Sequence, residues 1–535
     1  MLKKIPILSI LIILFSNFVQ SQTLDYCFVV VGCNRVSSSD TTGDASTANV
    51  YHLNRTFSEI AQMNPLPKYF FLAGDIIEGY TDGDTVRLAQ EYTGWKRLYL
   101  NSALAGTSVK LVVIPGNHEV ENDSDSTRAL ASAERTFVRE MTSYIIGNNG
   151  PKATGLVPGT DSLITDQSQL TYSFNYKNLS TKNDHFVLVD TDPVGRDWKA
   201  PYRWVNTDVT ASREAGSTRH IFAIGHKPAY PTPLNPTDGL VIYPYQRNMF
   251  WNALQNNRAE AMFAAHNHVW DTVHYNKKLS TWQVIAGNGG SSPESSWTTP
   301  YFGYTIVNVY TNGKVEIQSM GRLLGSSGYT ASVNSVPTIV MATADITFPT
   351  TITYTPIANS KINGPFSSQV TIVDNDTVTS AYVIYSVNGG VQDTINLTDS
   401  GNVYKFTIPE QPNSSGTIKY RIVANGSTVA SYPSASTFSS FSYTNSATGI
   451  ITLPAADDIK VYPNPTTGTL TVDLLSHKGI TTITIQNVNG VSLRTINNIN
   501  SSIVTTDISA LAPGTYFMLF TNVSGQQFIK KIIKN

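Results

Sequence analysis

Short apolar runs recur through the first part of the chain and predict buried strands. They lie at residues 28–31, 69–73, 109–114, 220–224 and 261–265. Segments with helical periodicity separate some of these runs, as at 86–104 and 202–212. This mixture of strand and helix patterns predicts an α/β domain at residues 22–345.

The pattern changes after Pro349, where the helical periodicity disappears. Segments rich in Val, Ile, Thr and Tyr follow, and Asn-Gly or Gly-Gly turns separate them. Clear examples lie at 369–373, 380–387 and 417–424. These features predict an antiparallel β-sandwich of the immunoglobulin or fibronectin type at residues 346–445. We assign residues 446–458 to a linker.

The first 21 residues have the pattern of a signal peptide. Two lysines precede an apolar run at 5–15, and small residues at 19 and 21 suit a signal peptidase. The run is too short for a comfortable transmembrane helix, and no later segment reaches spanning length. We therefore expect cleavage before Gln22 and an exported mature chain without a transmembrane segment.

Composition narrows the possible partners. The formal net charge is −1 and only 14% of residues are charged. Nucleic acid and anionic membrane surfaces attract strongly basic proteins, so this balance gives no reason to expect either partner.

The C-terminal segment, residues 459–535, is predicted to form a small all-β domain. It begins with VYPNPTTG at 461–468, contains APGTY at 512–516, and ends in a basic stretch. These spaced motifs closely resemble the type IX secretion sorting domain of Bacteroidetes-type bacteria. The resemblance implies export by the type IX secretion machinery, so that the protein is secreted or attached to the outer-membrane surface.

Four of the apolar runs lead into residues that commonly bind metals. Gly74-Asp75, Gly116-Asn117-His118-Glu119, Gly225-His226 and His266-Asn267-His268 follow these runs. A lone histidine after a strand is usually structural. A carboxylate, an amide and three imidazoles at buried strand ends need partners, and a bound cation is one that serves them all.

The order and spacing of these motifs resemble the calcineurin-like metallophosphoesterases, including their purple-acid-phosphatase branch. The resemblance extends over residues 26–322. The family pattern is Asp-x-His, Gly-Asp, Gly-Asn-His-Asp/Glu, Gly-His and Gly-His-x-His. This chain matches the last four motifs, with Ala265 in place of one glycine. The resemblance implies a four-layer αββα sandwich for the α/β domain.

The resemblance also implies a role for each motif residue. Asp75 bridges two metal ions, and Asn117, His226 and His266 complete the second site. His268 belongs to the first site, and His118 lies over the phosphate as a catalytic group that does not bind metal. Two such ions clamp a phosphoryl group and activate a water molecule as the nucleophile.

One motif departs from the family. Cys33 and Arg35 stand where the family has aspartate and histidine. Cys27 lies six residues away along the same predicted strand, so the two Cα atoms are about 20 Å apart. A disulfide spans no more than about 7 Å, and we therefore predict that Cys33 is a free thiol.

Three interpretations of this departure remain open. Cys33 replaces the aspartate as a thiolate ligand, which favours zinc or iron over magnesium or calcium. Alternatively the first ion is absent, and Arg35 supplies a positive charge whose fork matches phosphate oxygens. In the third interpretation the site has lost its chemistry. We favour the first, with an ion held by Cys33, Asp75 and His268.

We therefore predict a secreted metallophosphoesterase that hydrolyses phosphomonoesters or phosphodiesters with metal-activated water. Its cofactors would be one or two ions of Zn, Fe or Mn, and its substrate a small phosphoester. The alternative is a cell-surface binding protein that keeps the metallophosphatase fold with a mono-metal or inactive site.

Several other polar residues are assigned structural or surface roles. The resemblance to purple acid phosphatases implies an iron-binding tyrosine three residues after the bridging aspartate. That position is Glu78 here, and Tyr80 lies five residues after Asp75, which argues against a tyrosinate–iron site. The acidic run at 121–125 is predicted to be a solvated loop. The remaining residues in this group are Glu78, Asp190, Asp192, His52, His185, His220 and His274.

Overall fold

The computed structural model describes most of the chain. The described residues are 23–36, 50–122, 128–273, 281–294, 300–323, 336–375, 378–445, 459–474 and 479–535. The predicted signal peptide, the predicted linker and His274 lie outside them. One compact unit comprises Met1–Asn359, Gly364–Gln411 and Gly416–Ser442, and the other comprises Ser360–Asn363, Pro412–Ser415 and Tyr443–Asn535. The domain boundaries named above stay a prediction.

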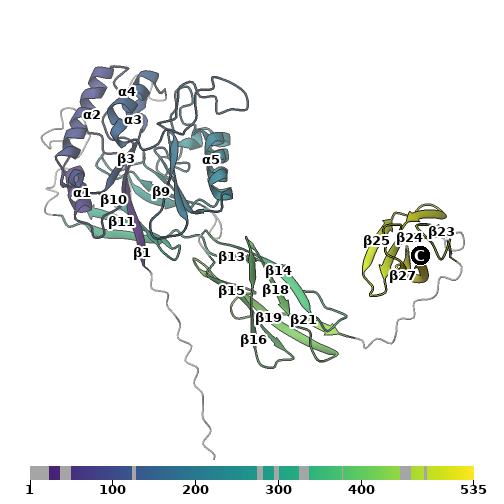
Figure 1. The fold of residues 1–535 in the computed structure, drawn as a ribbon. Helices are drawn as coiled ribbons and strands as arrows, with labels where there is room; N and C mark the ends of the chain where they lie inside the picture. Colours follow the sequence, from purple (N-terminus) through teal and green to yellow (C-terminus); the bar gives the residue numbers. More distant parts are fainter. Residues whose placement is uncertain are drawn as a thin grey trace, which may run out of the picture. The chain divides into compact units, whose positions relative to one another are not determined.

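The α/β domain contains two six-stranded sheets (Figure 1). The first has the order β12-β11-β10-β1-β2-β3, and its strands β1, β2 and β3 are parallel. Its strands are β1 (Leu24–Val31), β2 (Tyr69–Ala73), β3 (Lys110–Ile114), β10 (Tyr301–Tyr310), β11 (Val315–Leu323) and β12 (Ile339–Asp345). Strands β1, β2 and β3 therefore end at the same edge of the sheet.

The second sheet has the order β4-β5-β6-β7-β9-β8. Its strands are β4 (Tyr172–Tyr176), β5 (Asn183–Val189), β6 (Thr218–Gly225), β7 (Ala261–Ala264), β8 (Trp270–Val273) and β9 (Trp282–Ala286). Strands β5, β6, β7 and β9 are parallel, and β4 and β8 run antiparallel at the two edges. A central parallel set is thus present in both sheets.

Helices cover the outer faces of both sheets. They are α1 (Val50–Ala61), α2 (Thr85–Leu100), α3 (Asn117–Val120), α4 (Ala131–Met141), α5 (Tyr202–Glu214) and α6 (Pro244–Asn256), with short 3-10 turns at Ala103–Gly106, Thr142–Tyr144 and Leu240–Ile242. Phe70 of β2 packs in a cluster with α1, α2 and α4, whereas the next residue, Phe71, packs between the sheets against Phe186. Helices α5 and α6 pack on the outer face of the second sheet, in a separate cluster with Val187 and Ile221. The predicted four-layer αββα arrangement is confirmed.

The next part of the first unit is the predicted antiparallel β-sandwich, with sheet orders β13-β14-β18-β17 and β16-β15-β19-β20. Its strands are β13 (Thr351–Thr353), β14 (Phe366–Val373), β15 (Ser380–Val387), β16 (Asp393–Asn396), β17 (Thr398–Ser400), β18 (Val403–Ile408), β19 (Ser415–Asn425), β20 (Val429–Tyr432) and β21 (Ser439–Thr444). Strand β21 pairs with β19. Alternate residues of β18 are buried, as expected for strands with one face on a core.

The C-terminal domain is a small all-β domain of two sheets, β22-β23-β26 and β25-β24-β27-β28. Its strands are β22 (Lys460–Tyr462), β23 (Thr469–Asp473), β24 (Ile480–Asn487), β25 (Ser492–Asn497), β26 (Ile503–Asp507), β27 (Gly514–Asn522) and β28 (Gln527–Lys534). Ile483, Met518 and Phe520 belong to its own buried core. Among the described residues, no helix of the chain is long and apolar enough to span a membrane.

Candidate metal centre

The predicted site residues follow the carboxyl ends of five parallel strands from the two sheets. Cys33 and Arg35 follow β1, Asp75 follows β2, and Asn117 begins α3 just after β3. The three histidines at 226, 266 and 268 follow β6 and β7. Because both sheets present these strand ends on one side, residues more than 200 positions apart come into contact, as the hydrogen bond between Cys33 and His266 shows.

Backbone strain is concentrated at these residues. The φ angles are 58° at Cys33, 55° at Arg35, 54° at Asp75 and 67° at His266. Side chains other than glycine rarely adopt this left-handed region, and each such residue costs on the order of 1 kcal/mol or more. Strain of this kind persists where the surrounding structure imposes it, which is common at functional sites.

Two motif glycines allow the loops of the site to approach one another. A Cβ atom on Gly74 would lie 2.6 Å from Nδ1 of His226. A Cβ atom on Gly116 would lie 2.4 Å from Oδ1 of Asp75. Contact between loops therefore requires glycine at both positions, and the φ of 79° at Gly74 is a second reason there.

Four of the predicted ligands form one tight cluster. Nε2 of His226 lies 3.0 Å from Oδ1 of Asp75 and 2.9 Å from Oδ1 of Asn117. Nδ1 of His266 lies 2.9 Å from the same Asn117 oxygen and 3.3 Å from Nε2 of His226. Nδ1 of His226 contacts the carbonyl oxygen of Ala73 at 2.7 Å, which orients the ring. This oxygen and nitrogen donor set fits a metal ion.

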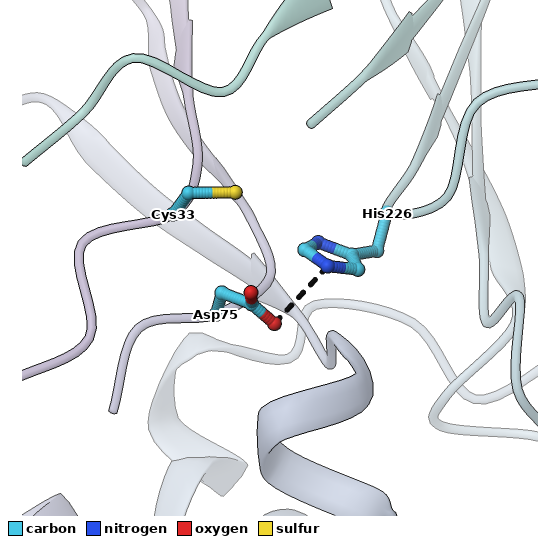
Figure 2. Close-up of side chains that lie close together, drawn as sticks. All are labelled: Cys33, Asp75 and His226. Carbon is cyan, nitrogen blue, oxygen red and sulfur yellow. Dashed lines mark ion pairs between the residues drawn. The ribbon is translucent and has the colours of Figure 1, made fainter. Parts of the chain in front are cut away.

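Cys33 lies beside this cluster. Sγ of Cys33 and ligand atoms of Asp75 and His226 are all within 4.8 Å of one another, and the three side chains point toward a common space (Figure 2). The sulfur accepts a hydrogen bond from the backbone N–H of His266 at 3.0 Å. Burial raises the pKa of the Cys33 thiol well above its usual value. Cys33 and Cys27 are both free, which confirms the predicted absence of a disulfide.

Arg35 forms an ion pair with Asp75. Its Nη2 and Nε lie 3.1 and 3.3 Å from Oδ2 of the buried Asp75 carboxylate. Burial raises the pKa of Asp75, but the positive charges of His226, His118 and Arg35 outweigh it and hold this pKa well below its usual value. The carboxylate is therefore charged, and Arg35 directly contacts the oxygen that faces away from His226.

The remaining two predicted residues lie at the edge of the cluster. Nδ1 of His268 donates to the carbonyl oxygen of Ser292 at 2.7 Å, and its buried Nε2 has no hydrogen-bond partner among the described residues. Burial lowers the pKa of His268 to about 3. His118 contacts the carbonyl oxygen of Glu78 through Nδ1, and its Nε2 lies 3.8 Å from Oδ2 of Asp75. Both rings are thus held by backbone carbonyls.

Two carboxylates support the site, and the sequence did not assign a role to either. Glu119 accepts hydrogen bonds from the backbone N–H groups of Asp75, Ile76 and Gly116 at 2.6 to 2.8 Å. The sequence did contain a signal for Glu119, because it is the fourth residue of the Gly-Asn-His-Glu motif at 116–119. Oδ1 of Asp238 contacts Nε2 of His266 at 2.8 Å, which orients that ring. Nothing in the local pattern around Asp238 indicates this contact.

Two aromatic residues also border the site. The Tyr80 hydroxyl contacts Nδ2 of Asn117, and its ring centroid lies 4.1 Å from that of His118. Tyr80 therefore reaches the site although its spacing from Asp75 argued against a ligand role. The ring of Trp198 packs edge-on against His266 with a centroid distance of 5.9 Å.

The prediction of a solvated acidic loop at 121–125 is wrong for Glu121. Its side chain is buried, and Oε1 lies 2.6 Å from Nζ of Lys227, which also pairs with Asp192 at 2.6 Å. Lys227 directly follows His226 and is itself buried, so the Glu121 carboxylate that pairs with it is also buried. Residues 123–127 lie outside the described residues. His185 and His220 contact Asp208 and Glu260, consistent with their predicted structural roles.

Comparisons with known proteins agree with these motifs. Residues 39–270 match a family model described as "Calcineurin-like phosphoesterase", and residues 460–535 match "Secretion system C-terminal sorting domain". The first match begins after Cys33 and Arg35, which departed from the family pattern. Among curated proteins, none matches the chain by sequence.

Two solved structures each align with 60% of the chain. A purple acid phosphatase from yellow lupin (Lupinus luteus) seeds is 15% identical, with a TM-score of 0.39, and the alignment covers 60% of this chain and 58% of that one. A putative 5'-nucleotidase from Staphylococcus aureus is 10% identical, with a TM-score of 0.34 and coverage of 60% and 54%. The chain thus spans less than two thirds of either structure. By its two family matches, it contains a calcineurin-like phosphoesterase domain and a C-terminal secretion-system sorting domain.

Proposed function

We propose that this protein is an exported, metal-dependent phosphoric ester hydrolase that acts on phosphomonoesters or phosphodiesters outside the cell. One observation carries the proposal: Nε2 of His226 lies 2.9 to 3.3 Å from donor atoms of Asp75, Asn117 and His266. Ligand atoms about 2.1 Å from a shared zinc ion in a tetrahedral site would lie about 3.4 Å apart, slightly farther than these separations. The C-terminal sorting domain implies secretion and supports the extracellular location.

The residues around this cluster have complementary roles in the proposed reaction. A bound cation supplies Lewis-acid chemistry, which activates water and stabilises charge on phosphoryl oxygens. His118 is oriented by the Glu78 carbonyl and exchanges a proton with the leaving oxygen through Nε2. Arg35 contributes a permanent positive charge next to Asp75. Asp238 orients His266 from the opposite side of that ring.

Turnover of simple phosphoesters tests this proposal. Purified residues 22–535, supplied with Zn²⁺, Mn²⁺ or Fe²⁺, should hydrolyse p-nitrophenyl phosphate or its bis-ester. The Asp75→Asn variant should lose at least about 100-fold in kcat/KM, because it removes the charge that holds the cation and its partners. Asp345→Asn, at an exposed end of β12, is the matched control and should retain full activity.

A negative result would be informative only with metal bound. Wild-type protein that contains metal and is folded, yet turns over no member of a broad phosphoester panel, would contradict the proposal. That outcome would instead favour the cell-surface binding protein that the sequence left as an alternative.

A further inference from the structure

The two oxygens of Asp75 have different neighbours. Oδ1 lies 3.0 Å from Nε2 of His226 and accepts the backbone N–H of His118 at 3.3 Å. Oδ2 lies 3.1 and 3.3 Å from Nη2 and Nε of Arg35. One oxygen therefore faces the His226 imidazole, and the other faces the Arg35 guanidinium.

The donors on the Oδ1 side are sufficient for one ion. Asn117 and His266 complete this set, and their donor atoms are 2.9 Å apart. The Ala73 carbonyl contacts Nδ1 of His226, and the Asp238 carboxylate contacts Nε2 of His266, so both imidazoles have a fixed orientation. Such supporting contacts are typical of built metal sites, because they fix the tautomer and direction of each ring.

The Oδ2 side does not fit a second ion. The remaining predicted donors are Sγ of Cys33 and Nε2 of His268. The sulfur lies within 4.8 Å of ligand atoms of Asp75 and His226, and it already accepts the backbone N–H of His266 at 3.0 Å. Arginine stays protonated under all ordinary conditions. A divalent ion placed beside Oδ2 would therefore be repelled by Arg35 and would have to compete with it for the carboxylate.

We propose that the centre holds one metal ion, bound by Asp75, Asn117, His226 and His266, and that Arg35 replaces the second ion. This inference rests on the proposed function and deepens it. The guanidinium gives Asp75 its second positive neighbour and binds a phosphoryl oxygen of the substrate. Its side chain is 22% exposed, and its Nη1 has no hydrogen-bond partner among the described residues, so a donor remains for phosphate.

Metal stoichiometry on residues 22–535 tests the number of ions. Inductively coupled plasma mass spectrometry should find one ion per wild-type chain and one in Cys33→Ser. The double variant Cys33→Asp, Arg35→His introduces the Asp-x-His motif and should bind two. Two ions in wild type would overturn the inference. So would one ion in the double variant, provided that its circular dichroism spectrum matches wild type.

Binding of inorganic phosphate tests the role of Arg35. Isothermal titration calorimetry of metal-loaded Arg35→Gln should show roughly tenfold weaker phosphate binding, with the metal content unchanged. Arg494→Gln, in the C-terminal domain, is the matched control and should bind phosphate like wild type. Equal phosphate affinity in Arg35→Gln and wild type would overturn this role.

Neither measurement depends on turnover, so the two proposals can fail separately. One bound ion without phosphoester hydrolysis would refute the proposed function and leave the one-ion centre standing. Hydrolysis by protein that contains two ions would support the proposed function and refute the one-ion centre.

Discussion

Glu119 shapes the loop that carries Asp75. Its two carboxylate oxygens accept hydrogen bonds from the backbone N–H groups of four residues in two loops, at 2.6 to 3.1 Å. The side chain is buried, so those N–H groups have no access to water as an alternative partner. A residue to which the sequence assigned no role thus holds the strained backbone of Asp75 in place.

The Glu119→Gln variant tests this account. In this variant an amide nitrogen replaces one carboxylate oxygen. The nitrogen cannot accept a hydrogen bond, so the backbone N–H groups that face it lose their partner, at a cost of about 1–3 kcal/mol for each buried group. We expect the free energy of unfolding in urea to fall by roughly 3 kcal/mol. Glu214→Gln, at an exposed position near the end of α5, should change it by less than about 0.5 kcal/mol. Equal stability of the two variants would contradict this role for Glu119.

The single glycine replaced in the matching motifs also has a local explanation. Ala265 is fully buried, and a Cβ atom on Gly32 would lie 2.4 Å from its Cβ. The alanine methyl group therefore fits because the facing residue is glycine. A larger side chain at either position would push the ends of β1 and β7 apart.

At the scale of elements, a buried lysine joins three segments that frame the metal centre. Lys227 follows β6, Glu121 follows α3, and Asp192 lies after β5. The ammonium also lies 3.5 Å from the ring centroid of Trp198, which packs against His266. These contacts link the strand ends of the second sheet to the loop after α3 without involving a metal ligand directly.

We predict that Lys227→Met destabilises the first unit strongly. Removal of the ammonium leaves two buried carboxyl groups without their cation, a change that typically costs about 3–5 kcal/mol. Lys314→Met removes a partly exposed ion pair with Glu316 and should cost less than about 1 kcal/mol. Urea unfolding of both variants, followed by circular dichroism, compares the losses. A small loss at Lys227 would show that this network adds little to stability.

At the scale of the whole molecule, the C-terminal domain has its own apolar core. Phe520 is fully buried there among residues that include Ile483 and Ile532. The phosphoesterase domain has separate clusters on each side of its two sheets. Separate cores predict that the two parts unfold independently.

The Phe520→Ala variant tests that independence. Loss of a buried phenyl ring costs about 3–5 kcal/mol, so the C-terminal domain should unfold at a lower temperature. The metal content and phosphoester turnover of the first unit should stay unchanged. Val523→Ala, at a position that is 79% exposed, is the control and should shift neither transition. Loss of turnover in Phe520→Ala would show that the domains are coupled.

The sequence by itself determined the fold class and most of the candidate ligands. The apolar runs at 69–73 and 261–265 coincide closely with β2 and β7, because buried parallel strands require continuous apolar residues. The motifs of the site can be found in the sequence for a related reason. Each ligand immediately follows its strand, so local order along the chain is enough to find it.

Only the tertiary structure decided which side chains meet. Asp238 contacts His266, which lies 28 residues away in the sequence, and Glu121 contacts Lys227, which lies 106 residues away. Arg35 contacts Oδ2 of Asp75, 40 residues away. No local pattern encodes such contacts, because they depend on how loops from different strands close over one another. The sequence favoured Cys33 as a ligand of a first ion. The ion pair of Arg35 with Asp75, visible only in three dimensions, is the contact from which we propose a single ion.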